Sequence, residues 1–341
     1  MIFFLVFIST AAVLFYEFYW KRRNLPPGPT PLPLLGNLVS VVKCSPGYEC
    51  FREWRKEYGP VYTYWLGPQP MVVVADYQTM KESIIKDGDK FADRFVLHTL
   101  RDFGMGKNLM EERVMLEVDF LIDRMRSLKT DLNMQSEFDT AVGSIINNIL
   151  FGYRFDESKQ HEFKLIKGHL RTLRWTFGEP KMHEELDRVI GSDRMITMAD
   201  KNDLPYVNAV VNEAQRVANL LPQNLQRKLL EDTVIGGHPI KAGTVVMPQI
   251  STVLYDERVF PDPYTFKPER FINSDGSLKK YDELVPFSVG KRQCVGEGLA
   301  KVELFLFVAN LFQRFKFSAK QTPSMVKNRG QVVTAKIIYA M

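Results

Sequence analysis

Cysteine is scarce in this chain, because Cys44, Cys50 and Cys294 are the only three among 341 residues. Three cysteines at these spacings supply neither an even set of disulfides nor a Cys-x-x-Cys pair, so we expect Cys44 and Cys50 to be free thiols. Five histidines are scattered along the chain, and neither His161 nor His183 begins the His-Glu-x-x-His pattern of zinc hydrolases. These observations exclude a disulfide-stabilised protein and a zinc hydrolase of that type.

Long runs of one charge, glycine-rich linkers and repeats are also missing. The net charge is +5 with both signs mixed throughout the sequence, which excludes a typical nucleic-acid-binding protein. The glycines at 104 and 106 are not continued by the residues of a phosphate-binding loop. At about 150 residues per domain the length allows two domains, yet no linker follows residue 37. We therefore expect one globular body over 38–341.

Charged side chains are absent from residues 1–16, and 1–20 contains a single acid. About 20 residues cross the core of a bilayer, and the three basic residues 21–23 follow directly. Because no basic residue precedes them, the positive-inside rule places the rest of the chain in the cytosol. We expect a membrane anchor at 1–20, followed by a basic flank and a proline-rich hinge at 21–37. A cleaved signal peptide is the alternative, because residues 9–12 are small, but its usual basic start is missing.

The remaining cysteine, Cys294, lies in the run FSVGKRQCVG at 287–296. A thiolate is stabilised by nearby positive charge or hydrogen-bond donors, and glycines let backbone amides approach its sulfur. Two glycines of the run flank the cysteine, and its lysine and arginine add positive charge. Apolar residues at helical spacing follow, which predicts a nearby helix N-terminus whose dipole favours an anion. The alternative is a buried, inert cysteine in a glycine-containing loop.

Two further runs carry charges upstream of this cysteine. Glu213 and Arg216 are three residues apart in a stretch of helical periodicity, so their side chains share one face of the predicted helix. On a protein surface such a pair contributes under about 1 kcal/mol, and the spacing alone is a weak signal. Arg270 lies in the run Pro-Glu-Arg-Phe at 268–271, between that pair and the cysteine.

Together these runs resemble the motifs of the cytochrome P450 monooxygenases. Residues 287–296 match the haem-ligand signature Phe-x-x-Gly-x-Arg-x-Cys-x-Gly at every fixed position, and Glu213, Arg216 and Arg270 precede it in the family's order. The run at 100–107 is similar to one in microsomal members that oxidise drugs and lipids. The resemblance implies a mainly α-helical fold with a small β-sheet, in which the three charged residues form a buried triad that specifies the fold.

The resemblance also implies a function and a set of partners. The Cys294 thiolate ligates the iron of haem b and increases the electron density that favours O–O cleavage, and one oxygen atom enters an apolar substrate such as a steroid, a fatty acid or a foreign compound. Electrons come from NADPH through a flavoprotein reductase, with Lys291 as a candidate contact, and a small haem protein is a second donor. The expected location is the endoplasmic reticulum membrane, with a single-pass anchor and the body facing the cytosol. The residues implied around the haem are Phe287, Gly290, Arg292 and Gly296, together with Arg227, and the two arginines are implied to contact the propionates.

Two segments of the family are missing from the sequence. The helix that crosses the distal face of the haem carries an acid followed by threonine, preceded by glycine, and the Asp-Thr pairs at 139 and 232 do not stand in that setting. The Trp-x-x-x-Arg helix that holds a propionate is also absent, because no tryptophan is followed by arginine at the fourth position. We infer internal deletions near 94–95 and 170–180. The expected fold therefore lacks part of the helices over the distal haem face.

These gaps leave three hypotheses open. The chain is an active haem-thiolate monooxygenase, or it is a catalytically impaired, membrane-anchored haem-binding short isoform or gene-model fragment. A third hypothesis is a chain that misfolds, because losing covering helices exposes apolar surface. The first two predict haem binding, and they differ in whether the protein couples electron consumption to a hydroxylated product.

Periodicity and turn residues predict a coarse set of elements. Helices are expected at 49–57, 76–86, 109–129, 139–151, 160–176, 180–190, 204–218 and 297–315. Strands are expected at 61–66, 71–74, 234–235, 244–248 and 315–318.

Overall fold

The computed structural model describes residues 20–44, 49–91, 107–127, 132–133, 140–145, 180–219, 224–319 and 334–339, with the single residues 4, 15, 16 and 137. The chain divides into two compact units. The first unit comprises Met1–Asp93, Leu221–Pro261 and Glu283–Cys294, and the second comprises Arg94–Leu220, Asp262–Asp282 and Val295–Met341. Because the chain passes from one unit to the other several times, no stretch of linker composition marks the division.

The first unit is built on a sheet with the strand order β1-β2-β7-β4. Its strands β2 and β7 are parallel, and the other neighbouring pairs are antiparallel. The strands are β1 (Val61–Leu66), β2 (Gln69–Val74), β4 (Arg227–Lys228) and β7 (Val245–Pro248), with β5 (Thr233–Ile235) and β6 (His238–Ile240) forming a separate hairpin. The helical elements are α2 (Leu38–Lys43), α3 (Glu49–Tyr58), α4 (Tyr77–Met80) and α11 (Ile250–Leu254), the 3-10 helices η1 (Trp20–Arg22), η3 (Gly88–Phe91) and η8 (Gly290–Arg292), and the π-helix η2 (Lys81–Ile85).

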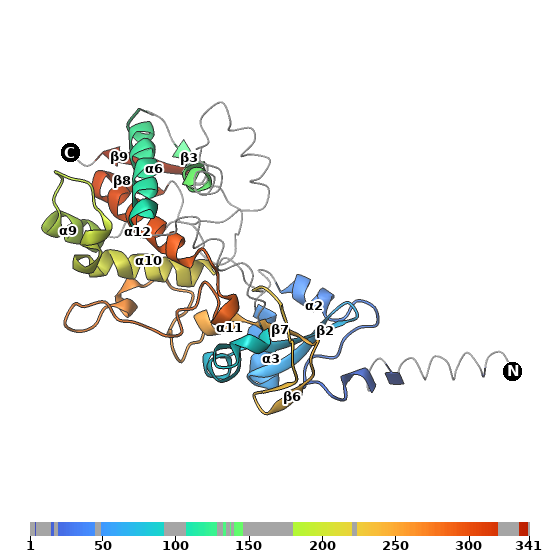
Figure 1. The fold of residues 1–341 in the computed structure, drawn as a ribbon. Helices are drawn as coiled ribbons and strands as arrows, with labels where there is room; N and C mark the ends of the chain where they lie inside the picture. Colours follow the sequence, from blue (N-terminus) through green and yellow to red (C-terminus); the bar gives the residue numbers. More distant parts are fainter. Residues whose placement is uncertain are drawn as a thin grey trace. The chain divides into compact units, whose positions relative to one another are not determined.

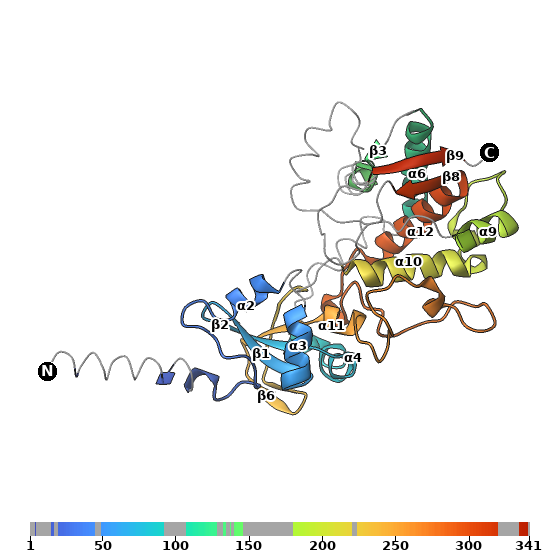
Figure 2. The same cartoon turned by 180° about the vertical axis from the view of Figure 1, so that it is seen from behind.

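Aromatic side chains join α3 to the sheet in this unit. Phe51 and Trp54 of α3 are buried, and both pack against Tyr64 of β1, at ring-centroid distances of 5.2 and 5.9 Å. Figure 2 shows α3 lying across β1 and β2. Large aromatic rings bury much apolar area, so this cluster fixes the helix on the sheet. The hydroxyl of Tyr62 donates to the carbonyl oxygen of Phe51 at 3.1 Å, which satisfies its buried polar atom.

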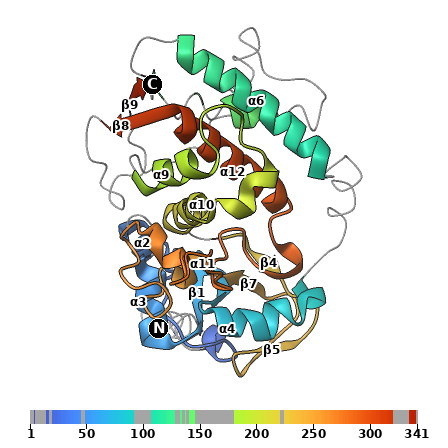
Figure 3. The same cartoon turned by 90° about the vertical axis from the view of Figure 1, so that its left-hand side faces the viewer.

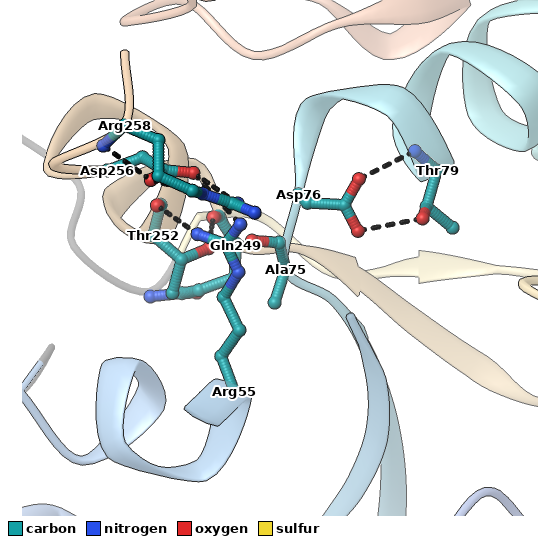
Figure 4. A network of polar contacts seen from close by, with 8 residues as sticks. All are labelled: Arg55, Ala75, Asp76, Thr79, Gln249, Thr252, Asp256 and Arg258. Carbon is teal, nitrogen blue, oxygen red and sulfur yellow. Dashed lines mark hydrogen bonds and ion pairs between the residues drawn. The ribbon is translucent and has the colours of Figure 1, made fainter. Parts of the chain in front are cut away.

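A polar network connects α3 with the segment that follows α11 (Figure 4). The Arg55 guanidinium donates to Asp256 Oδ2 and to the Thr252 carbonyl oxygen, each at 2.9 Å, and the Thr252 hydroxyl donates to the Ala75 carbonyl oxygen at 2.6 Å. Burial raises the pKa of Asp256, but hydrogen bonds from Arg258 and Arg55 outweigh it and hold the pKa at about 2. The network therefore carries its charges in paired form near neutral pH.

The second unit is a group of packed helices with a small sheet at its C-terminal end (Figure 1). Its helical elements are α6 (Lys107–Ser127), α9 (Pro180–Val189), α10 (Pro205–Ala218) and α12 (Glu297–Arg314), with the 3-10 helices η6 (Met198–Asp203) and η7 (Pro268–Phe271). The strands β3 (Leu132–Asn133), β9 (Thr334–Tyr339) and β8 (Phe315–Ala319) form an antiparallel sheet in that order.

Helix α12 is the centre of this unit. It contacts α6, α9 and α10, and Figure 3 shows α10 end-on beside α9 and α12. Residues 305–312 of α12 are all buried, as expected of a helix that is covered on every side. Helix α10 begins with Pro205, and the carboxylate of Glu185 on α9 accepts the first amides of α10, those of Tyr206 and Val207, at 3.0 and 2.9 Å. This contact ties two core helices together.

Most of the predicted elements are confirmed within one or two residues at their ends. The predicted helix 76–86 is divided into α4 and the π-helical turn η2. The prediction missed α2, α11, the short strands β3, β4 and β6, and β9, most of them too short to show a period. The predicted helix 160–176 lies outside the described residues, as do the inferred deletion sites near 94–95 and 170–180; of the helix 139–151, residues 140–145 are described and are helical.

The predicted membrane anchor at 1–20 lies largely outside the described residues. Within the part of the chain that is described, no helix is both long enough and apolar enough to cross a bilayer.

A carboxyl group is buried in the core of the second unit. Glu303 on α12 is 7% exposed, and its Oε1 has no hydrogen-bond partner among the described residues. Burial raises the pKa of Glu303 from 4.5 to about 8. The folded protein therefore holds a proton that the unfolded chain releases at neutral pH, and the free energy of unfolding decreases as the pH rises from about 4.5 to about 8.

We predict that Glu303→Gln stabilises the protein at pH 7. Glutamine is neutral at every pH, so folding no longer requires the free energy of protonating the carboxyl group. The expected gain is on the order of 3 kcal/mol, measured by denaturant unfolding between pH 5 and pH 8. Glu297→Gln on the same helix is the control, since Glu297 forms an ion pair with Lys301 at 2.6 Å. Equal pH dependence of stability in wild type and Glu303→Gln contradicts this account.

Candidate active site

The residues before Cys294 form a closed loop in the first unit. The Cys294 amide donates to the Phe287 carbonyl oxygen at 2.9 Å, and the Gln293 amide donates to the Gly290 carbonyl oxygen at 2.9 Å. The loop includes the 3-10 turn η8, and it ends with the Cys294 side chain exposed. The backbone therefore fixes the position of the cysteine while leaving its sulfur accessible to a ligand. We call residues 287–294 the cysteine loop.

Gly290 of the cysteine loop cannot be replaced without strain. Its φ of +72° lies in the left-handed region that favours glycine. A Cβ at this position would lie 2.7 Å from the carbonyl oxygen of Ile84, at the end of η2. Both the conformation and the close packing against η2 therefore require glycine. Gly296 differs, because its φ is −82° and its carbonyl oxygen accepts the Ala300 amide at the start of α12.

Arg227 on β4 holds the cysteine loop from one side. Its Nη2 donates to Ser288 Oγ at 2.8 Å and to the Val289 carbonyl oxygen at 2.7 Å, and Asn224 donates to the same hydroxyl at 3.0 Å. The Arg227 side chain is 6% exposed, yet its Nη1 has no hydrogen-bond partner among the described residues. Arg227 thus binds the cysteine loop through Nη2, while its buried Nη1 remains available as a hydrogen-bond donor.

A second cation lies near this buried guanidinium. Burial, and secondarily the charge of Arg292, lower the pKa of Arg227 to about 10, whereas Arg292 itself is exposed. No carboxylate in the described ranges forms an ion pair with either arginine. Two neighbouring cations with an unused buried donor are suited to an anionic group, because charged hydrogen bonds would satisfy the donor and relieve the repulsion.

Lys291 is a residue of the cysteine loop and contacts η3. The resemblance made it a candidate contact for a reductase, which stays a prediction; in the structure its ammonium forms an ion pair with Asp89 of η3, and its side chain is 35% exposed. The resemblance did not indicate this partner, because Asp89 is 202 residues away along the chain.

The predicted triad of charged residues is brought together in the second unit. Glu213 and Arg216 are both fully buried, and the guanidinium donates two hydrogen bonds to the carboxylate at 2.7 and 2.8 Å. The Nε of Arg270 donates to Glu213 Oε1 at 3.1 Å, and the Lys267 amide donates to the same oxygen at 2.9 Å. The Arg216 Nη1 donates to the carbonyl oxygen of Pro263 at 2.8 Å. The triad therefore fastens the segment 263–270 to α10.

The structure divides the predicted site residues between the two units. Phe287, Gly290, Arg292, Cys294 and Arg227 belong to the first unit, and Glu213, Arg216, Arg270 and Gly296 belong to the second. Sequence reasoning missed Ser288, Asn224, Ile84, Gly88 and Asp89, which contact the cysteine loop or form part of it. Ser288 lies inside the motif and has a φ of +71°, but the other four carry no motif, and only the fold brings them to the loop.

Comparison with known proteins identifies the family. The model of the cytochrome P450 family matches residues 26–109 and 179–339. The chain is similar to cytochrome P450 2H2 of Gallus gallus, with 29% identity covering 98% of this chain and 94% of that protein. It is also similar to cytochrome P450 2A5 of Mus musculus, with 29% identity covering 93% of this chain and 92% of that protein, and to cytochrome P450 2E1 of Bos taurus, with 30% identity covering 92% and 91%.

The alignments to these relatives are longer than the chain itself. The match to the chicken protein extends over 472 positions, whereas the chain has 341 residues, so the relative contains residues that have no counterpart here. The family model leaves 110–178 unmatched. The matched residues nevertheless include the cysteine loop and the triad. The chain therefore belongs to the cytochrome P450 family, whose members are monooxygenases that use haem iron as cofactor.

Proposed function

We propose that this chain is a haem-thiolate monooxygenase of the endoplasmic reticulum membrane, with Cys294 as the axial ligand of the iron. It would insert one atom of molecular oxygen into an apolar substrate, such as a steroid, a fatty acid or a foreign compound. The observation that carries this proposal is the buried Nη1 of Arg227 beside the cysteine loop, because it is a cationic donor without a partner among the described residues.

Haem fits the residues of this loop. Its propionates are anions, and they would supply the hydrogen-bond acceptor that Arg227 lacks and the negative charge that Arg227 and Arg292 require. Its iron takes an axial ligand, which a cysteine thiolate can supply, and Cys294 is exposed at the end of the loop. The same loop thus offers a ligand for the metal and cations for the carboxylates of one prosthetic group.

The chain's own residues would hold and orient this group. The bond from the Cys294 amide to the Phe287 carbonyl oxygen fixes the backbone of the ligand, and Gly290 lets the loop pack directly on η2. Arg227 fastens Ser288 and Val289 with one nitrogen and leaves the other for a propionate. When bound, a thiolate-ligated haem supplies the activation of molecular oxygen.

The electron source and the membrane location rest on other features. We propose NADPH as the source, through a flavoprotein reductase, with a small haem protein as a second donor and with Lys291, whose side chain is 35% exposed, as the candidate contact for an acidic partner. Attachment to the membrane is supported by exposed apolar side chains beside the basic flank. These are Trp20, Leu32, Leu34, Leu35 and Val42, exposed by 54, 50, 87, 49 and 70%, and such exposed apolar residues are typical of membrane or protein contacts.

We predict that Arg227→Gln weakens haem retention, because it removes the charged donor that a propionate would use. The expected loss of affinity is roughly ten- to a hundred-fold, from the 1.5–3 kcal/mol of one hydrogen bond to a charged group. The measurement is the rate and extent of haem transfer to an apo-haem protein in excess. Lys228→Gln is the matched control on the same strand, since Lys228 is exposed. Equal haem retention in both variants would refute the assignment of Arg227.

A second candidate function is favoured by the length of the alignments. The relatives contain residues that this chain lacks, and we propose that they include helices over the distal face of the haem, with deletions near 94–95 and 170–180. Such a chain is a short form that binds haem but lacks the acid and threonine that deliver protons to oxygen in the family. The Asp-Thr pair at 232 does not replace them, because Thr233 begins β5 and Asp232 forms an ion pair with Lys241 at 2.6 Å.

The two candidates predict different fates for the electrons taken from NADPH. For the short form we expect that most of the NADPH consumed with reductase and apolar substrate yields hydrogen peroxide. The measurement compares NADPH consumed, peroxide formed and hydroxylated product, with a catalase-treated sample as control. A hydroxylated product that accounts for nearly all the NADPH consumed would contradict the short form and favour the active monooxygenase.

A further inference from the structure

Besides Arg227, the cysteine loop contacts η2 and η3, through Gly290 and Lys291. The two elements are successive turns of one segment, Lys81–Phe91, and the first of them is a π-helix. Rare π-helical turns widen the backbone and are frequent at functional sites. Here the widened turn ends at Ile84 and Ile85, where the Gly290 backbone packs against the carbonyl oxygen of Ile84.

Gly88 of η3 provides a second close contact with the loop. Gly88 is buried, and a Cβ at this position would lie 3.0 Å from Cγ and 3.4 Å from Cδ of Lys291. The aliphatic part of the Lys291 side chain therefore lies close to the Gly88 backbone, and a side chain at position 88 would crowd it. This contact directs the side chain along η3 rather than into solvent.

The end of the Lys291 side chain reaches the carboxylate of Asp89, the residue after Gly88. The Nζ of Lys291 forms an ion pair with Asp89 Oδ1. Asp89 itself is 78% exposed, so its carboxylate is not required by the core of the unit. Its contact with the cysteine loop crosses 202 residues of sequence.

The element that carries Asp89 is itself held in place. The Leu230 amide donates to the Lys90 carbonyl oxygen at 2.8 Å, close to the strand β4 that carries Arg227. Lys90 forms an ion pair with Asp87 at 2.9 Å. The elements that carry Arg227 and Asp89, both of which contact the cysteine loop, are thus joined to each other.

We propose that Asp89 is a positioning residue for Cys294, acting through Lys291 with the bare backbone of Gly88 as a guide. The ion pair fixes the residue that follows Gly290 and so limits the opening of the loop between Gly290 and Cys294. Its consequence for the iron ligand rests on the proposed function, but the effect on the loop does not. Lys291 is therefore a structural contact of its own chain, rather than only an exposed charge for a partner.

Hydrogen exchange of two loop amides tests the proposal directly. The amides of Gln293 and Cys294 are bonded within the loop, so their exchange reports its opening. In the full-length protein, Asp89→Asn should accelerate their exchange roughly two- to five-fold, as expected from losing a partly exposed ion pair. Glu82→Gln is the matched control, because Glu82 is an exposed carboxylate of η2 that bonds to Gln78 and not to the loop.

A charge exchange separates pairing from a general effect of charge. The double variant Asp89→Lys with Lys291→Glu should restore slow exchange, whereas each single variant should accelerate it. Wild-type exchange in Asp89→Asn, equal acceleration in Glu82→Gln, or failure of the double variant to restore protection would each overturn the proposal.

A second measurement separates this proposal from the proposed function. In the reduced, carbon-monoxide-bound protein, Asp89→Asn should show a larger share of haem without the thiolate band than Glu82→Gln. If wild type binds no haem at all, while the exchange of Gln293 and Cys294 still depends on Asp89, the proposed function fails and the positioning role stands. If wild type shows the band and Asp89→Asn has wild-type exchange, the positioning role fails and the proposed function stands.

Discussion

The fold and the proposed site depend on two buried arginines, Arg216 and Arg227, and on which groups are available to bind each guanidinium. Burying a guanidinium without a partner costs several kcal/mol, and the chain meets this cost differently at the two positions. Arg216 is fully buried and donates two hydrogen bonds to the carboxylate of Glu213. Arg227 is almost as buried, but one of its nitrogens has no partner among the described residues, and its nearest charge of note is another cation, Arg292. The first arginine therefore serves the fold, and the second is suited to an anionic ligand.

The same contrast explains the roles of the motifs around these residues. Glu213 also binds Arg270 and the Lys267 amide, so its carboxylate is used completely inside the second unit. The cysteine loop is instead closed by its own backbone bonds and packed on η2 through Gly290. The exposed thiol of Cys294 and the spare donor of Arg227 on β4 are the groups that we propose for binding a prosthetic group. Membership of the cytochrome P450 family identifies that group as haem.

The sequence was sufficient for the parts that depend on local spacing. The helical spacing put Glu213 and Arg216 on one face, and the resemblance added Arg270 to the triad. Gly290 was visible as part of the cysteine motif, but the sequence did not indicate its positive φ or its packing on Ile84. Asp89 was not visible, because an exposed aspartate in a polar turn has no local signature and its partner is 202 residues away. The two units were also hidden, since each is assembled from three separate segments with no linker between them. The π-turn η2 was predicted as ordinary helix because its composition does not distinguish the two.

The account depends most directly on Cys294 as the iron ligand. The decisive measurement is the absorption spectrum of the reduced, carbon-monoxide-bound protein expressed in membranes, for wild type, Cys294→Ala and Cys50→Ala. Cys50 is buried in the first unit, and burial raises its thiol pKa to about 12, so it is a cysteine that cannot act as the thiolate. The account predicts the strongly red-shifted band of thiolate-ligated haem in wild type and Cys50→Ala and its loss in Cys294→Ala. A band that survives in Cys294→Ala, or no band in wild type, would contradict it.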